Sequence, residues 1–188
     1  TDAYQPLREM KEHEMLMMKK ALNYSYENST ILDIGCADGL FISEVAKELP
    51  KALITGIDIS SKLIDIAKAK KCQNCTFLVE DAEKFEPDKK FDLIIASGIL
   101  SVFDNFETIL ELWLKWLERQ GKLIIFGRFN SRDIDVKVSF RNNYKASDWE
   151  GGLTSYSIQT IGRFLDRLGC EYEYNKFIFS GDLPKNKD

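Results

Sequence analysis

The sequence is poor in the residues that build metal centres and disulfide frameworks. It contains four cysteines and one histidine among 188 residues. Cysteines this few and this scattered do not make a disulfide framework in a domain of this size, so we expect reduced thiols. Cys72 and Cys75 have the CxxC spacing of a redox or zinc site, but zinc would need a second pair of ligands. We therefore predict no metal site and interpret this pair as incidental cysteines in a helix-to-strand loop.

An excess of positive charge and long apolar runs are also absent. The net charge is -4, so the broad positive field that draws proteins onto nucleic acid or anionic membranes is missing. No apolar run approaches the roughly 20 residues that span a bilayer, and residues 1–10 lack the apolar centre of a signal peptide. We therefore expect a cytoplasmic protein whose partners are small molecules or proteins, with no nucleic acid and no membrane. The oligomeric state stays open.

Short apolar runs bounded by glycine or polar turns recur along the chain, as buried strands do. They lie at residues 30–36, 52–59, 75–80, 91–97 and 121–127. Apolar residues at helical spacing fill most of the gaps, for example at 40–49 and 105–120. This alternation predicts an α/β fold, a doubly wound, mostly parallel sheet with helices on both faces. We expect one domain at 28–188, preceded by a helical lid segment at 1–27.

The first predicted strand ends in a carboxylate followed by two glycines. Asp33, Gly35 and Gly39 occupy the turn into the first helix, where doubly wound sheets bind ligands. The glycines permit a tight turn and a close backbone approach, and the amides at 39–42 can receive an anionic group. Asp58 ends the second strand and can accept hydrogen bonds from both hydroxyls of a ribose. These features predict a nucleoside-shaped site.

Two cofactor classes fit such a site. A dinucleotide fingerprint would need glycine at 37 and 40, where Ala37 and Leu40 stand, so a dehydrogenase fits poorly. Residues 28–130 instead resemble the class I Rossmann-like S-adenosylmethionine-dependent methyltransferases, whose first motif reads close to LDIGCADG. The resemblance implies S-adenosyl-L-methionine as cofactor and S-adenosyl-L-homocysteine as product. It also implies which residues contact each part of the cofactor. The methionine portion is contacted by Asp33, Gly35, Cys36, Ala37 and Gly39, and the ribose by Asp58 and Ile59. The adenine is contacted by Asp81 and Ala82, and the sulfonium lies beside Ser97 and Gly98.

Catalytic residues are harder to assign, because methyl transfer needs mainly a well-positioned nucleophile and needs a base only for a protonated acceptor. A helix predicted at about 6–22 places Glu14 inside its apolar stripe and His13 on its flank. In one interpretation this helix covers the cofactor and points Glu14 or His13 at the acceptor. In the other, which we favour, Glu14 emerges at the edge of the packing and His13 is solvated.

Arg128, just past the fifth predicted strand, is the third candidate. It could hold an anionic acceptor with help from Arg132 or Arg141, or it could belong to a solvated basic loop. Four aromatic residues could wall an acceptor pocket or could serve ordinary packing: Tyr4, Phe103, Tyr144 and Trp149.

The sequence therefore predicts an S-adenosylmethionine-dependent methyltransferase acting on an O or N atom of a small-molecule acceptor. Residues 97–100 read SGIL instead of the Asn-Pro-Pro-Tyr-like motif of enzymes that methylate nucleic-acid bases or glutamine, which argues against that branch. Two alternatives stay open. One is methylation of a protein or peptide side chain, and the other is a non-catalytic S-adenosylmethionine-binding module.

The last third of the chain departs from the alternating pattern. Residues 131–153 are polar and could form a lid, although 133–140 alternate as in a short strand. Related methyltransferases complete the sheet with a sixth strand and an antiparallel seventh inserted beside the fifth. Residues 171–179 suit the sixth strand, but 180–188 cannot form a buried central one. We expect the seventh strand to come from sequence beyond Asp188, from 133–140 or from a second chain.

Overall fold

The computed structural model describes residues 9–144 and 148–178 of the chain. Its centre is a five-stranded parallel sheet with strand order β3-β2-β1-β4-β5. The strands are β1 (Thr30–Ile34), β2 (Leu53–Asp58), β3 (Cys75–Val79), β4 (Phe91–Ser97) and β5 (Leu117–Phe126). The helices are α1 (Glu12–Tyr24), α2 (Leu40–Glu48), α3 (Ser61–Ala69), the short η1 (Leu100–Val102), α4 (Phe106–Lys115) and α5 (Ile158–Arg167).

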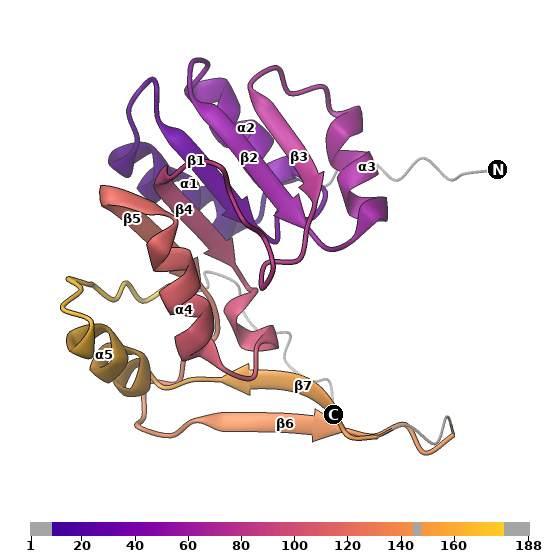
Figure 1. The fold of residues 1–188 in the computed structure, drawn as a ribbon, viewed down its shortest axis with the longest axis vertical. Helices are drawn as coiled ribbons and strands as arrows, with labels where there is room; N and C mark the ends of the chain where they lie inside the picture. The colour runs from indigo at the N-terminus through magenta and orange to yellow at the C-terminus, as the bar shows by residue number, and fades with distance from the viewer. Residues whose placement is uncertain (1–8, 145–147, 179–188) are drawn as a thin grey trace, which may run out of the picture.

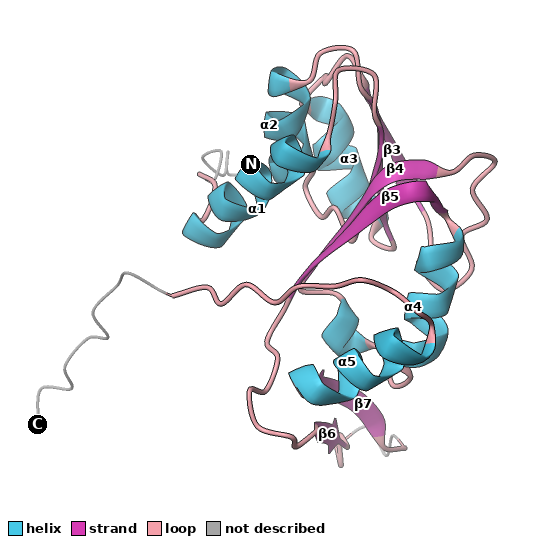
Figure 2. Ribbon diagram, turned by 90° about the vertical axis from the view of Figure 1, so that its left-hand side faces the viewer, coloured by secondary structure: helices cyan, strands magenta, loops and turns pink. Residues whose placement is uncertain are grey.

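Helices cover both faces of the sheet, as the alternating sequence predicts (Figure 2). Helices α1, α2 and α3 lie on one face, and α4 and α5 lie on the other. Neighbouring residues of β1 therefore enter different cores: Ile31 packs in the cluster that includes α2, and Leu32 packs in the cluster that includes α4. Both side chains are fully buried. The predicted α/β doubly wound fold is confirmed, and double-sided burial explains why its strands read as continuous apolar runs.

Helix α1 begins later than the sequence pattern suggests. Residues 9–11 are not helical, and residues 1–8 lie outside the described part of the chain. The carboxylate of Glu14 accepts a hydrogen bond of 2.7 Å from the backbone amide of Lys11, which stabilises the first turn at Glu12. Met17 and Ala21 anchor this helix in the core. The interpretation of 1–27 as a lid stays a prediction.

The segment expected to be a lid or a short strand forms an antiparallel hairpin. Strand β6 (Val136–Phe140) pairs with β7 (Glu150–Ser155) in a separate two-stranded sheet. The hairpin lies beyond the carboxyl ends of the parallel strands (Figure 1). It is fixed there by a hydrogen bond of 2.7 Å from the Tyr156 hydroxyl to the Phe103 carbonyl and by a Lys137 to Asp104 ion pair of 2.9 Å.

The expected completion of the sheet is wrong within the described residues. Residues 171–178 form no strand, and residues 133–140 do not join the central sheet. Glu173 instead bonds Lys20 at 3.0 Å, and Phe177 meets Phe126 edge to face. This segment thereby helps to line a groove of about 830 Å³ along β5, whose outer edge no described strand covers. Of the three expected sources of a seventh strand, further sequence and a second chain stay predictions.

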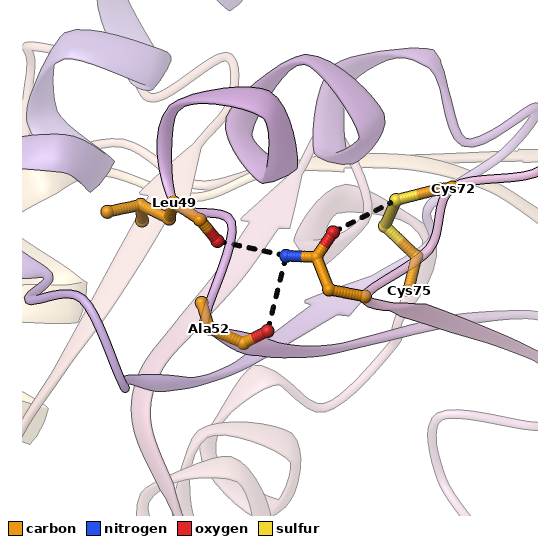
Figure 3. Close-up of a disulfide and its surroundings, with 5 residues drawn as sticks. Leu49, Ala52, Cys72 and Cys75 are labelled. Carbon is orange, nitrogen blue, oxygen red and sulfur yellow. Dashed lines mark hydrogen bonds between the residues drawn. A yellow bond between two sulfur atoms is a disulfide. The ribbon is translucent and has the colours of Figure 1, made fainter.

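The CxxC pair also departs from expectation. Cys72 and Cys75 are joined in a disulfide, so the prediction of reduced thiols is wrong for this pair (Figure 3). Cys72 lies in the loop between α3 and β3, as expected, whereas Cys75 is the first residue of β3. Asn74 inside this loop donates from its side-chain amide to the carbonyls of Leu49 (2.9 Å) and Ala52 (3.2 Å). No group of residues suited to hold a metal ion occurs in the described part of the chain.

Candidate functional site

The loop after β1 is bent by three residues with left-handed backbone conformation. Gly35, Ala37 and Gly39 have φ values of 73°, 49° and 69°. The amide of Gly35 donates to the carbonyl of Ile57 at 2.8 Å, which closes the loop against β2. A Cβ atom on Gly39 would lie 2.8 Å from that of Ala67, so a larger residue would clash. The loop thus requires glycine at 35 and 39, and Ala37 adopts a strained left-handed conformation.

Asp58 holds this loop to the next one. Its carboxylate accepts hydrogen bonds from the amide of Ala37 (3.0 Å) and from the amide of Ser60 (2.9 Å). It therefore sits between the turn after β1 and the start of α3. A carboxylate oxygen can accept more than one hydrogen bond, so Asp58 retains capacity for the ribose hydroxyls that the sequence assigns to it.

Three carboxylates from different elements gather at this edge of the sheet. Asp33 is buried at the end of β1, and Glu14 is buried in the first turn of α1. Burial raises the pKa of Asp33 to about 7 from its usual 3.8, and the charges of Asp58 and Glu14 add to the shift. This concentration of negative charge suits a ligand with an ammonium or a sulfonium group.

Cys36 lies beside these carboxylates but has no chemical role that its environment supports. Burial raises the pKa of its thiol well above the usual range, and the charges of Asp33 and Asp58 act in the same direction. The thiol stays protonated at neutral pH and is a weak nucleophile. We assign it to the packing of the loop.

The ends of β3 and β4 carry the remaining predicted contacts. Asp81 accepts a hydrogen bond of 3.0 Å from the amide of Glu83, and this bond, with Lys84, holds the pKa of its carboxyl below the usual range. Ala82 beside it is buried, whereas Ile59 after β2 is 74% exposed. An apolar side chain this open suits the face of a flat ring.

Gly98 leaves free space after β4. Its φ is 73°, and a Cβ atom added to it would meet nothing within 4 Å. Its amide donates to the carbonyl of Phe126 at 2.7 Å, which brings the end of β5 beside it. Ser97 is partly buried at the end of β4. This opening is consistent with the sulfonium side that the sequence resemblance assigns to Ser97 and Gly98.

The acceptor candidates are placed differently from our favoured interpretation. The ring of His13 stacks on Phe126 with centroids 4.5 Å apart, so His13 is not simply solvated. Glu14 is buried and contributes to the electrostatics of Asp33, so it does not emerge at the packing edge. Periodicity alone placed Glu14 on the inner face of its helix, but it could not say which strand that face meets.

Among the described residues, neither the arginine nor the aromatic candidates line the groove along β5. Arg128 is exposed two residues past β5, and its carbonyl accepts a hydrogen bond of 3.1 Å from the Ser155 hydroxyl. Phe103 packs edge to face on the buried Trp113, which makes it a packing residue. The other described aromatics, Tyr144 and Trp149, are exposed. Tyr4 lies outside the described residues.

Comparison with known proteins identifies one family. The methyltransferase domain family matches residues 25–166. Malonyl-[acyl-carrier protein] O-methyltransferase of Priestia megaterium is 31% identical over 124 residues, covering 65% of this chain and 45% of that protein. Malonyl-[acyl-carrier protein] O-methyltransferase 2 of Ilyobacter polytropus is 31% identical over 146 residues, covering 76% and 55%. The chain thus spans about half the length of these curated relatives.

Solved structures give the same fold. Plantazolicin methyltransferase BpumL, in complex with S-adenosylhomocysteine (SAH) and a triazolic analogue, is 29% identical with a TM-score of 0.53, covering 60% of this chain and 43% of that one. The DhpI-SAM-HEP complex has a TM-score of 0.64 at 17% identity, covering 84% and 78%. At that identity the second likeness shows the fold alone. Within the described residues, no helix is long and apolar enough to cross a membrane.

A first prediction concerns the ribose contact. Replacing Asp58 with Ala removes a charged hydrogen-bond acceptor, a loss of about 1.5 to 3 kcal/mol, so affinity for S-adenosylmethionine should fall at least tenfold. Calorimetric titration measures the change. Asp65→Ala, which removes an exposed carboxylate from α3, is the matched control and should bind as the native protein does. Unchanged affinity in the Asp58 variant would remove this residue from the site.

A second prediction follows from the raised pKa of Asp33. A carboxyl that titrates near 7 in the folded state and near 3.8 in the unfolded chain stabilises the fold most below pH 3.8. This contribution is lost as pH rises toward 7, because the folded state must then hold a buried charge. Urea unfolding should show a smaller fall in stability between pH 5 and 8 for Asp33→Asn than for the native protein. Equal slopes in the two proteins would contradict the assignment.

Proposed function

Because the chain belongs to the methyltransferase domain family, we propose that it is an S-adenosylmethionine-dependent enzyme that methylates a carboxylate oxygen of its acceptor. Asp33, Asp58 and Glu14 support the cofactor assignment, since their charges complement the ammonium and the sulfonium. The cofactor supplies the methyl group, and the chain's own residues orient it. This narrows the sequence-based prediction of an O- or N-directed transferase to an oxygen.

Arg128 is the observation that carries the choice of acceptor. It follows β5, whose last carbonyl bonds the amide of Gly98 on the sulfonium side. Arg128 has no ion-pair partner among residues 9–144 and 148–178, whereas the carboxylates on the cofactor side would repel an anion. An arginine fork binds a carboxylate through two parallel hydrogen bonds. The two curated relatives described above are named for a malonyl acceptor, which carries such a carboxylate.

The proposal assigns no residue as a general base, and a carboxylate acceptor requires none. Its oxygen is already deprotonated at neutral pH, so transfer requires alignment with the methyl group and no proton removal. Methylation of a protein or peptide acceptor remains the second candidate, favoured by the likeness to plantazolicin methyltransferase. In the first candidate the accepting atom belongs to a malonyl-like carboxylate, and in the second it belongs to a protein or peptide. Both candidates use the same cofactor site.

The acceptor is tested with tritiated S-adenosylmethionine and three probes: malonyl-coenzyme A, a phenol and a primary amine. We expect an alkali-labile methyl ester on the malonyl carboxylate. Arg128→Ala should raise KM for malonyl-coenzyme A roughly tenfold or more through loss of a charged hydrogen bond, with cofactor affinity unchanged. Arg119→Ala, an exposed arginine early in β5, is the matched control. Methylation of the amine or the phenol alone would reject the carboxylate.

Replacing Glu14 with Gln and His13 with Asn tests for a catalytic base. With a carboxylate acceptor, we expect both variants to keep their turnover across pH 6 to 9, because no proton is removed. A loss of roughly 100-fold in kcat without weaker cofactor binding would instead identify a base, and with it a hydroxyl acceptor.

A further inference from the structure

The residues of the β6–β7 hairpin are mostly exposed, and its buried side chain, Thr154, lies on one face. Lys137 and Thr154 lie opposite each other on the inner face, where Thr154 is buried and Lys137 pairs with Asp104. Side chains of a strand alternate between faces, so every second residue points the other way. Four apolar side chains lie on this outer face, with exposed fractions of 45%, 51%, 50% and 41% for Val136, Val138, Phe140 and Leu153, and the exposed Glu150 lies opposite Phe140 at its distal end.

Such a face needs a partner. A two-stranded ribbon is marginally stable alone, and apolar side chains on adjoining strands make a patch that water covers poorly. None of the four outer residues lines the groove along β5. Small molecules bind in concave sites, so an open and flat apolar face fits a protein surface better.

The charges at the base of the hairpin indicate the sign of that partner. Arg128 and Arg132 are exposed there and make no ion pair within the described residues. Of the nearby acids, Asp133 pairs with Arg163 at 2.8 Å, and Asp135 accepts hydrogen bonds from the amide of Ser157 and the hydroxyl of Thr160 and keeps its negative charge. Arg128 and Arg132 together outweigh Asp135, so the balance of charge among these residues is positive.

At the distal end, charges of both signs occur together. Arg141 stacks 5.4 Å above the ring of Trp149, and Asp148 and Glu150 are exposed beside it in sequence. The chain as a whole carries a net charge of -4. An acidic partner would therefore be repelled by most of the surface and attracted to the base of the hairpin.

The hairpin also stands beside the transfer end of the site. It packs on the segment that follows η1, and η1 begins two residues after Gly98. Figure 1 shows it beyond the carboxyl ends of the strands, on the side where β4 and β5 end. Arg128 connects the two regions along the chain: Phe126, two residues before it, bonds Gly98, and its own carbonyl accepts from the Ser155 hydroxyl at the base of the hairpin.

We propose that the outer face of the hairpin, with Arg128 and Arg132 at its base, docks an acidic protein that carries the methyl acceptor as an attached group. The docking protein supplies apolar contact to the four outer residues and carboxylates to the arginines. The attached group then passes Arg128 toward the methyl. This inference rests on the proposed carboxylate acceptor but adds a surface and a class of partner to it.

The test compares one acceptor group on two carriers: malonyl-acyl carrier protein and malonyl-coenzyme A. Val138→Ser with Phe140→Ser removes apolar contact from the outer face. Since truncation of buried interface anchors commonly costs above 1 kcal/mol each, KM for the carrier protein should rise about tenfold or more. KM for malonyl-coenzyme A should stay unchanged, which also shows that the variant is folded. Leu53→Ser with Ile66→Ser removes exposed apolar side chains elsewhere and is the matched control.

Binding is measured separately, by fluorescence anisotropy of labelled malonyl-acyl carrier protein. Native protein should bind it, the hairpin variant should bind at least tenfold more weakly, and added salt should weaken the native complex. The anisotropy measurement reports docking even if no methyl group is transferred. Binding without methylation would therefore reject the proposed carboxylate acceptor and leave the docking face supported. Equal binding by native and hairpin variants, or no binding by either, overturns the proposal. Binding to phosphatidylglycerol vesicles is measured in parallel. If the hairpin variant loses binding to the vesicles but not to the carrier protein, the outer face binds a lipid surface and the proposal is overturned.

Discussion

Parallel pairing of β1 with both β2 and β4 is the constraint from which the site follows. Parallel strands must end at the same edge, so the turns that leave them are brought together whatever their distance in sequence. Asp33 and Asp58 lie at the same edge because Asp33 is the last but one residue of β1 and Asp58 ends its neighbour β2, and Gly98 follows the other neighbour, β4. Asp58 then locks two of these turns by accepting from the amides of Ala37 and Ser60.

The same convergence carries an electrostatic cost. Two buried carboxyls, Asp33 and Glu14, lie near a third at Asp58, and burial raises the pKa of Asp33 accordingly. Bringing like charges together in a buried place costs free energy, because burial disfavours the charged form of a carboxyl. A cationic ligand beside these carboxyls would lower that cost, which is the physical link between the raised pKa of Asp33 and the proposed cofactor.

The sequence predicted the parts of the structure that rest on local pattern. Double-sided burial gives each central strand a continuous apolar run, and the turn after β1 needs glycine where a Cβ atom would clash, so fold class and loop could both be read. Long-range choices were not readable. The alternation at 133–140 indicated a strand but not its partner, and the stripe of α1 placed Glu14 inward without revealing Asp33 as its neighbour. The Cys72 to Cys75 disulfide was missed because spacing does not determine pairing.

The charges of the two sides of the site have opposite sign, and the proposed reaction gives this a consequence. Asp33, Asp58 and Glu14 gather near the turn after β1, which the proposal assigns to the methionine portion, and Arg128 lies two residues past β5, whose last carbonyl bonds Gly98. Transfer of a methyl from a sulfonium to a carboxylate turns a positive and a negative reactant into two neutral groups. Water stabilises the charged sulfonium and carboxylate more than the transition state, in which both charges are already partly neutralised. A site that excludes water therefore lowers the barrier to transfer. A cover over the opening at Gly98 would therefore increase the rate. A partner docked on the hairpin as proposed would lie beside this opening and would provide that cover, which would link acceptor delivery to the exclusion of water.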